Sequence, residues 1–114
     1  MTLDARLLLT LDVINVFRYC LRMILSFTCP DTEAIFNQRR VARFVNIQSV
    51  ALRKLAQLNA AVTLDFLRVP PGNRLELLQG DRAGQYSIRI NDQWRICFVW
   101  KAGNATAVEI VDYH

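Results

Sequence analysis

Apolar and polar residues alternate along most of the second half of the chain, and an alternation with a period of two is typical of a β-strand with one buried face. The alternation is strongest in GQYSIRI (84–90) and QWRICFVW (93–100) and weaker in RLELLQ (74–79) and TAVEIVDY (106–113). A short β-branched and aromatic run, MILSFT (23–28), stops at a cysteine–proline pair. The pattern therefore predicts one strand early in the chain and four consecutive strands at its end.

Between these strands the apolar residues recur with the period of an α-helix. Asp31 and Thr32 offer an N-cap for a short basic helix, EAIFNQRR (33–40). The segment VNIQSVALRKLAQLNAAV (45–62) is the clearest helix of the chain. The residues expected on its buried face are Val45, Ser49, Leu52, Leu55, Ala56 and Leu58. Those expected to face solvent are Arg53, Lys54 and Gln57.

The register of the hairpin between the two strongest strands follows from its buried face, because a slip by one residue would turn every core side chain outward. A three-residue loop at 91–93 aligns Ile88 with Ile96, whereas a two-residue turn would scramble both faces. We therefore predict the three-residue loop, with Asn91 or Asp92 adopting the positive φ that such a loop needs.

This register places Arg89 opposite Arg95 on the face away from the core, where two like charges repel and favour the binding of an anion. A second three-residue loop, at 101–103, would set Glu109 across from Arg95. The alternative is a pair of solvated arginines with Glu109 nearby. The whole pattern predicts an α+β fold in which helices cover one face of an antiparallel sheet and the other face is open and rich in arginine.

The chain of 114 residues is 53% apolar and 21% charged, which suits one globular domain and argues against disorder. Its formal net charge of +4 is compatible with a polyanionic partner. The three cysteines are widely spaced and there is one histidine, so neither a disulfide scaffold nor a metal site is expected. We expect reduced thiols, mostly buried, in a cytoplasmic protein.

Residues 1–22 differ from the rest because they are strongly apolar and precede a second methionine. Asp4 and Asp12 make the segment a poor signal peptide, and it is too short and too charged to span a membrane. It is either an extra element that packs on the domain or contacts a partner, or the result of an early start codon. We favour the second interpretation, with a domain over 23–114.

The remaining candidate chemistry is a set of cations, an aromatic residue and the histidine. The chain has no glycine-rich phosphate loop and no nucleophile elbow. RNA carries its own nucleophile, the 2′-OH, so a protein that cleaves it has to align that group, move protons and neutralise phosphate charge. An arginine suits the last task, and Tyr113 and His114 could stack on a base or transfer protons. The alternatives are strand packing for Tyr113 and an inert tail for His114.

The stretch PPGNRLELLQGDRAGQYSIRINDQWRICFVW, with VEIVDYH at the end, resembles the HigB branch of the RelE-type toxins of bacterial toxin–antitoxin modules, also called plasmid maintenance killer proteins. The marks of that family are the G-D-R turn, the motif N-x-x-W-R-I-x-F and the final D-Y-H. The resemblance runs from Met23 to His114 and includes DTEAIF and ALRKLAQLNAA.

The resemblance implies a RelE-like α+β fold, with two N-terminal helices packed on a curved antiparallel β-sheet in a single domain. It implies a metal-free endoribonuclease without cofactors that cuts messenger RNA in the A site of the 30S ribosomal subunit and so arrests translation. It also implies a HigA-type helix-turn-helix antitoxin as the partner. The toxin is expected to reach operator DNA only through that antitoxin and not to bind a membrane. The implied catalytic residues are Arg95, Asp112, Tyr113 and His114, and the candidate RNA-binding residues are Arg74, Gln79, Arg82 and Arg89.

The chain departs from the family at Gln79, where relatives commonly carry lysine before the G-D-R turn. A glutamine can donate a hydrogen bond to phosphate, but without charge assistance the bond is about half as strong. An attenuated toxin is therefore expected. The alternative function is a non-catalytic module that binds antitoxin or ribosomal RNA and has lost cleavage through Gln79 or through occlusion by residues 1–22.

Overall fold

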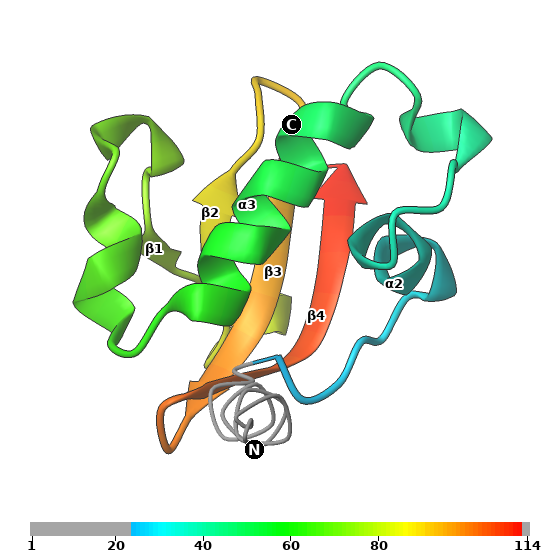
Figure 1. Ribbon diagram of the computed structural model, residues 1–114. Coiled ribbons are helices and arrows are strands. Elements are labelled where there is room, and N and C mark those ends of the chain that lie inside the picture. The colour runs from blue at the N-terminus through cyan, green and yellow to red at the C-terminus, as the bar shows by residue number, and fades with distance from the viewer. Residues whose placement is uncertain (1–23, 113–114) are drawn as a thin grey trace, which may run out of the picture.

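The computed structural model describes residues 24–112 (Figure 1). The predictions for residues 1–22, Tyr113 and His114 lie outside this range. Within it, two α-helices pack on one face of a four-stranded antiparallel sheet of order β1-β2-β3-β4. The predicted α+β class and single domain are confirmed. The elements are α2 (Pro30–Phe36), α3 (Gln48–Ala60), β1 (Glu76–Leu77), β2 (Tyr86–Arg89), β3 (Trp94–Lys101) and β4 (Asn104–Asp112).

Helix α2 begins earlier than its capping pattern suggested. Cys29 is the N-cap and Pro30 is the first helical residue, a position where proline's missing N–H costs nothing. Asp31 and Thr32 lie inside the first turn, so the predicted cap is wrong. The helix ends at Phe36 and leaves the arginines of EAIFNQRR in the following loop.

Helix α3 presents a different face to the core from the one expected. Ala51, Leu55 and Leu58 are buried, whereas the predicted core residues Val45, Ser49 and Ala56 are exposed. Because the helix starts at Gln48, the first residues of the predicted helix belong to the preceding turn and the apolar stripe is rotated. Arg53 faces solvent as predicted, whereas the side chains of Lys54 and Gln57 reach the 67–73 segment.

The β2–β3 hairpin has the predicted register. Ile88 pairs with Ile96 and Arg89 pairs with Arg95. The loop at 91–93 forms differently from expectation, because none of its residues has a positive φ. Instead, Asn91 Oδ1 accepts hydrogen bonds from the N–H groups of Gln93 and Trp94, each at 2.8 Å, and these bonds shape the loop.

The β3–β4 hairpin differs from its prediction. Its turn has two residues, Ala102 and Gly103, both with positive φ, and a bulge with Ala107 at φ 53° follows in β4. Glu109 consequently pairs with Cys97, and the residue opposite Arg95 is Val111.

The early run MILSFT lies beside β4 in the parallel direction, through bridges from Ile24 to Ala105 and from Phe27 to Val108. It forms these isolated bridges and no continuous strand within the described part of MILSFT. Its backbone bonds include Leu25 N–H to the Ala105 carbonyl at 2.8 Å. This segment therefore covers the edge of the sheet that β4 would otherwise expose.

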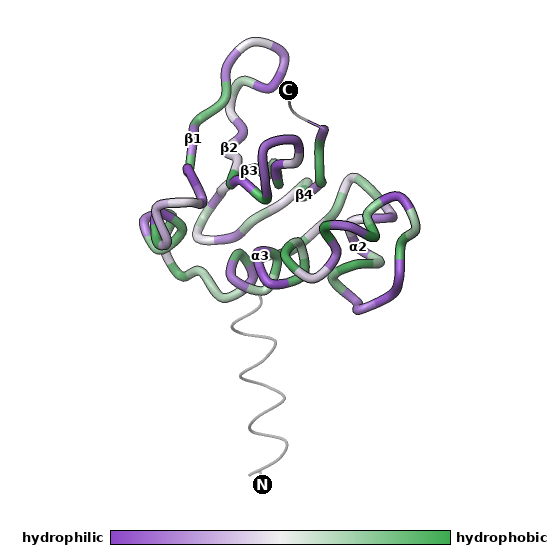
Figure 2. Tube along the Cα trace, turned by 90° about the horizontal axis from the view of Figure 1, so that it is seen from above, coloured by the Kyte–Doolittle hydropathy of each residue, from purple (hydrophilic) through white to green (hydrophobic). Residues whose placement is uncertain are grey.

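The core lies between the sheet and the helices. Figure 2 shows apolar residues in green on the helices and on the strands that face them. The largest fully buried apolar side chains are Phe44, Phe98, Ile35, Leu55, Leu58, Leu67, Ile88, Ile96 and Val108. The 78–85 loop, which contains a 3₁₀ turn at Gly80–Arg82, lies on the other side of the sheet (Figure 2). Within residues 24–112, no helix has the length and apolar character needed to cross a membrane.

Candidate active site

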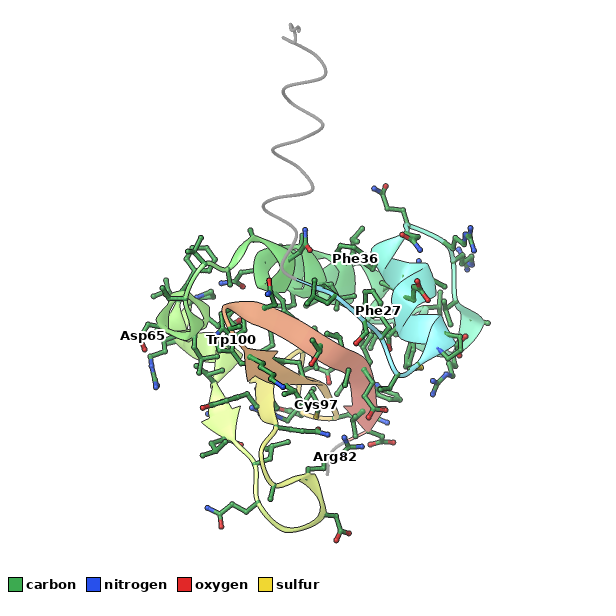
Figure 3. The ribbon with its side chains drawn as sticks, turned by 90° about the horizontal axis from the view of Figure 1, so that it is seen from below. Phe27, Phe36, Asp65, Arg82, Cys97 and Trp100 are labelled. Atoms are coloured by element: carbon green, nitrogen blue, oxygen red, sulfur yellow. The ribbon has the colours of Figure 1, made fainter. Side chains whose placement is uncertain are left out.

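The sheet face opposite the helices carries two rows of paired residues, which we call the open face. Opposed residues of an antiparallel pair project to the same side, so each row forms one line of side chains. The first row is Glu76, Ser87, Cys97 and Glu109, and the second is Arg89, Arg95 and Val111. Figure 3 shows Cys97 and Arg82 on this side of the sheet, with α3 on the other.

Arg95 is the most buried cation of the open face, with 8% of its surface exposed. Its Nε–H donates to Ser87 Oγ at 2.8 Å, and its Nη2 donates to the Arg74 carbonyl at 2.6 Å. The Glu76 carboxylate lies 3.7 Å from Nη2. A buried guanidinium needs such partners, and they fix the plane of its fork. The expectation of an exposed Arg95 is therefore wrong, because the segment before β1 folds over it.

That segment is held by Asn73, which is fully buried. The Asn73 amide donates to the Leu67 carbonyl at 3.0 Å and to Gln57 Oε1 at 3.2 Å, and its Oδ1 accepts a bond from the Lys54 ammonium. The next residue, Arg74, is in the left-handed region at φ 47° and turns its carbonyl toward the open face. The predicted RNA-binding Arg74 thus has an exposed side chain and a structural carbonyl.

The other predicted RNA-binding cations are paired with carboxylates. Arg82 Nη1 donates to Glu109 Oε1 at 3.1 Å and to Gln85 Oε1 at 3.0 Å. Arg89 pairs with Asp92. Gln79 is exposed at the start of the 78–85 loop's 3₁₀ turn. The four predicted RNA-binding residues come from the segment before β1, the 78–85 loop and β2, and Arg74 and Arg89 are the two next to Arg95, through the Arg74 carbonyl and the Arg89–Arg95 strand pair.

Asp112 lies at the end of β4 opposite Trp94. Because side chains alternate along a strand, it leaves β4 on the face of Trp94 and not on that of Arg95. Its Oδ2 accepts a hydrogen bond from Gln93 Nε2 at 3.1 Å. Tyr113 and His114, the two other predicted tail residues, lie outside the described residues.

Cys97 occupies the centre of the open face and is fully buried. Burial raises the pKa of its thiol; Arg82 and Arg95 lower that pKa and Glu109 raises it, and the balance is upward. The thiol is therefore neutral near pH 7 and is a poor nucleophile. No group of three or more potential metal ligands occurs in the part of the chain that the structure describes.

Three residues of the site were absent from the predicted set: Glu76, Ser87 and Asn73. Ser87 shares the face of Arg95 in the predicted β2–β3 register, so the alternation itself was a usable signal for this residue. Glu76 joins that face through the pairing of β1 with β2, for which no register was predicted. Asn73 had no comparable signal, because its partners come from α3 and from the loop after it.

A family model and a named relative point to the same family. A family model described as the RelE-like toxin of type II toxin–antitoxin system HigB matches residues 35–114. Toxin HigB-1 of Vibrio cholerae serotype O1 is 39% identical over 85 residues, which cover 73% of this chain and 90% of that protein. An uncharacterized protein of Haemophilus influenzae is 41% identical over 59 residues, or 52% of this chain and 56% of that protein.

Among solved structures, the YoeB–YefM complex from Staphylococcus aureus is similar at 17% identity and a TM-score of 0.48, covering 80% of this chain and 97% of that one. The family assignment rests on the sequence matches, which span most of the chain and include the open face and the end of β4. The chain belongs to the HigB family of RelE-like toxins of type II toxin–antitoxin systems.

Proposed function

We propose that this toxin is an endoribonuclease that cuts messenger RNA in the ribosomal A site and so stops translation, without a metal ion. The observation that carries the proposal is the setting of Arg95. Its guanidinium is buried, with its orientation fixed by Ser87 and the Arg74 carbonyl, on a sheet face edged by further cations. A preorganised cation in a site with little water stabilises developing negative charge far better than a mobile surface arginine.

In the proposed reaction the 2′-OH of the RNA attacks the adjacent phosphorus, and the bond from phosphorus to the 5′-oxygen breaks. A base takes the proton of the 2′-OH, and an acid gives a proton to the departing 5′-oxygen, leaving a 2′,3′-cyclic phosphate. Arg95 neutralises the charge that builds on the non-bridging oxygens. The protein supplies no covalent nucleophile.

Tyr113 and His114 are the proposed proton-transferring and substrate-positioning residues of the tail. Asp112, whose side chain leaves β4 on the face of Trp94, is the third proposed catalytic residue of the tail, and its role is to position the two residues that follow it. Glu76 is a further candidate for the base, because its half-exposed carboxylate lies 3.7 Å from the Arg95 guanidinium. Arg74, Gln79, Arg82 and Arg89 are the proposed contacts to the RNA backbone. Gln79 makes the toxin weaker than a relative with lysine at that position.

The proposed partners follow from the family. A HigA-type antitoxin with a helix-turn-helix would bind the toxin and carry it indirectly to operator DNA, and the ribosome would present the messenger RNA in the cytoplasm. The proposed toxin domain is 23–114. Expression with and without residues 1–22, with growth arrest as the readout, tests whether that segment contributes.

The central test is induced expression of wild type and Arg95→Ala, followed by mapping of 5′ ends in cellular messages. We expect new 5′ ends within codons for wild type and none for Arg95→Ala, a loss of at least about 100-fold from removing one preorganised charge-stabilising group. Arg53→Ala, on the solvent side of α3, is the matched control and should cut like wild type. Arrest by wild type without cleavage would favour the non-catalytic module.

A further inference from the structure

The ion pair between Arg82 and Glu109 occupies part of the open face. The two side chains are 31% and 29% exposed, so both are largely removed from water. Arg82 comes from the 3₁₀ turn of the 78–85 loop and Glu109 from the middle of β4. Their contact, at 3.1 Å, joins that loop to the far strand of the sheet.

This pair lies close to Arg95. Glu109 is directly opposite Cys97, and Cys97 is two residues after Arg95 on the same face of β3. Arg82, Glu109 and Arg95 all act on the pKa of the Cys97 thiol, as expected for charges around one small group. The pair therefore lies within reach of the nucleotides next to a phosphate bound at Arg95.

A carboxylate at this place opposes RNA in two ways. Arg82 has to exchange Glu109 for a phosphate before it can bind RNA, and the negative charge of Glu109 repels the phosphates around it. RNA that is held by other contacts tolerates this exchange, whereas a free strand that depends on a few cations loses much of its affinity.

We infer that Glu109 is a specificity-determining residue, which holds Arg82 and thereby selects against free RNA in favour of RNA that is presented to the toxin by a larger assembly. The inference rests on the proposed function, because it takes RNA as the ligand of the open face. Glu109 is not given a role in the chemical step; it sets which RNA reaches Arg95.

The test measures binding of a short fluorescein-labelled RNA by anisotropy over a series of potassium chloride concentrations. The RNA carries 2′-O-methyl groups, so it has no nucleophile and stays intact. Glu109→Gln retains the size of the side chain and removes the negative charge that pairs with Arg82. We expect this variant to lower the dissociation constant about 2- to 5-fold, because breaking one partly buried ion pair frees Arg82 to bind RNA. We also expect the slope of log affinity against log salt to steepen by about 0.7, which is one more phosphate contact on a single strand.

Asp65→Asn is the matched control. It removes the same charge from another arginine–carboxylate ion pair, the more exposed one with Arg68, in the connection between α3 and β1. Asp65 lies at the other edge of the molecule in Figure 3. Binding by Asp65→Asn should match that of wild type; an equal gain in both variants would mean that net charge alone acts, and would overturn the inference.

The double variant Arg82→Gln/Glu109→Gln should lose the gain in affinity and in salt slope, since the released cation is gone. An unchanged dissociation constant for Glu109→Gln, or a gain that persists without Arg82, contradicts the inference. Glu109→Asp, whose shorter side chain holds Arg82 less well, is the second variant should Glu109→Gln fail to fold, and it should change binding in the same direction. The cleavage assay on Arg95→Ala separates the proposed endoribonuclease function from the proposed role of Glu109. If Arg95→Ala abolishes cleavage while Glu109→Gln binds RNA like wild type, only the role of Glu109 is wrong.

Discussion

At the scale of single residues, burial determines how firmly a side chain of the open face is oriented, and Arg95 is the buried case. The Arg95 guanidinium is oriented by Ser87, by the Arg74 carbonyl and by Glu76, so in the proposed function it would bind a phosphate with little loss of side-chain entropy. Gln79 shows the opposite case, an exposed and uncharged group beside the same face. The proposed function therefore predicts that the strength of the toxin depends on how well each cation is held as well as on how many there are.

Gln79→Lys should give a stronger toxin. A lysine at the start of the 78–85 loop adds a charge-assisted bond to phosphate that is about twice as strong as the glutamine's. Growth arrest after graded induction measures the effect, and Gln38→Lys, in the loop after α2, controls for the added charge. Arrest that is unchanged or milder in Gln79→Lys would contradict the proposed role of this position.

Cys29 should react with iodoacetamide before Cys97 does. Burial alone would raise the pKa of the Cys29 thiol, but hydrogen bonds from Thr32 and Asp31 and the charge of Arg43 lower it overall. Burial raises the pKa of Cys97. The thiolate is the reactive form, so labelling of Cys29 should rise with pH and reach half of its maximum below pH 9.0, its ordinary pKa. Peptide mass spectrometry after short pulses gives both rates, and equal rates would refute the assignment.

At the scale of elements, turns and bulges determine which side chains meet across the sheet. The β3–β4 turn at Ala102 and Gly103 and the bulge at Ala107 each shift the pairing by one residue. Alanine is not a good residue for either place, because its Cβ clashes when φ is positive. These two positions are local weak points in a hairpin that carries Glu109.

Ala102→Asn should stabilise the protein by about 0.5–1 kcal/mol, because asparagine followed by glycine is the preferred pair for a two-residue turn of this kind. Urea unfolding followed by circular dichroism measures the change. Ala83→Asn, at a residue with φ of −53°, is the control and should leave stability unchanged. A similar gain at both positions would show that turn geometry is not the cause.

Asn73→Ala should cost about 2–4 kcal/mol of unfolding free energy, because it leaves the Leu67 carbonyl, Gln57 and the Lys54 ammonium without their partner in a buried place. Cleavage should fall as well, since the Arg74 carbonyl then loses its fixed position. Urea unfolding and cleavage are measured together, with the exposed Asn46→Ala as the control. A cost no larger than that of Asn46→Ala would be inconsistent with the network.

At the scale of the whole molecule, the helices and the 78–85 loop lie on opposite sides of one sheet (Figure 2). One side supplies the core, and the other presents cations. The link between α2 and the sheet includes a buried side chain, because Thr32 Oγ1 accepts the Ile110 N–H at 2.9 Å. This bond ties α2 to the half of β4 that leads to Asp112.

Thr32→Val, which keeps the shape of the side chain, should cost about 1–3 kcal/mol because the Ile110 N–H is left buried without a partner. Amide hydrogen exchange at Ile110 should accelerate by more than at Ile96 in the middle of the sheet. Thr106→Val, elsewhere on β4, is the control. Equal exchange at Ile110 in wild type and Thr32→Val would show that the bond contributes nothing to the docking of α2.

The sequence by itself determined the α+β class, the β2–β3 register and the family. Ile88, Ile96 and Phe98 have to face the core together, and a single register satisfies them. It also placed Glu109 on the face of Arg95, although opposite the wrong residue. The two one-residue shifts of the β3–β4 hairpin add up to two, which preserves the face and changes the partner.

Tertiary structure decided the burial of Arg95, the contact between Arg82 and Glu109, and the part played by Asn73. Each depends on segments that are distant in the chain, and local alternation carries no information about what folds over a face. The start of α2 at Pro30 and the rotated stripe of α3 were likewise set by packing, because a short amphipathic helix is stabilised mainly by the surface it covers. The hydrophobic pattern of a helix or strand specifies which of its faces is buried, and the rest of the fold determines which segments pack against each face.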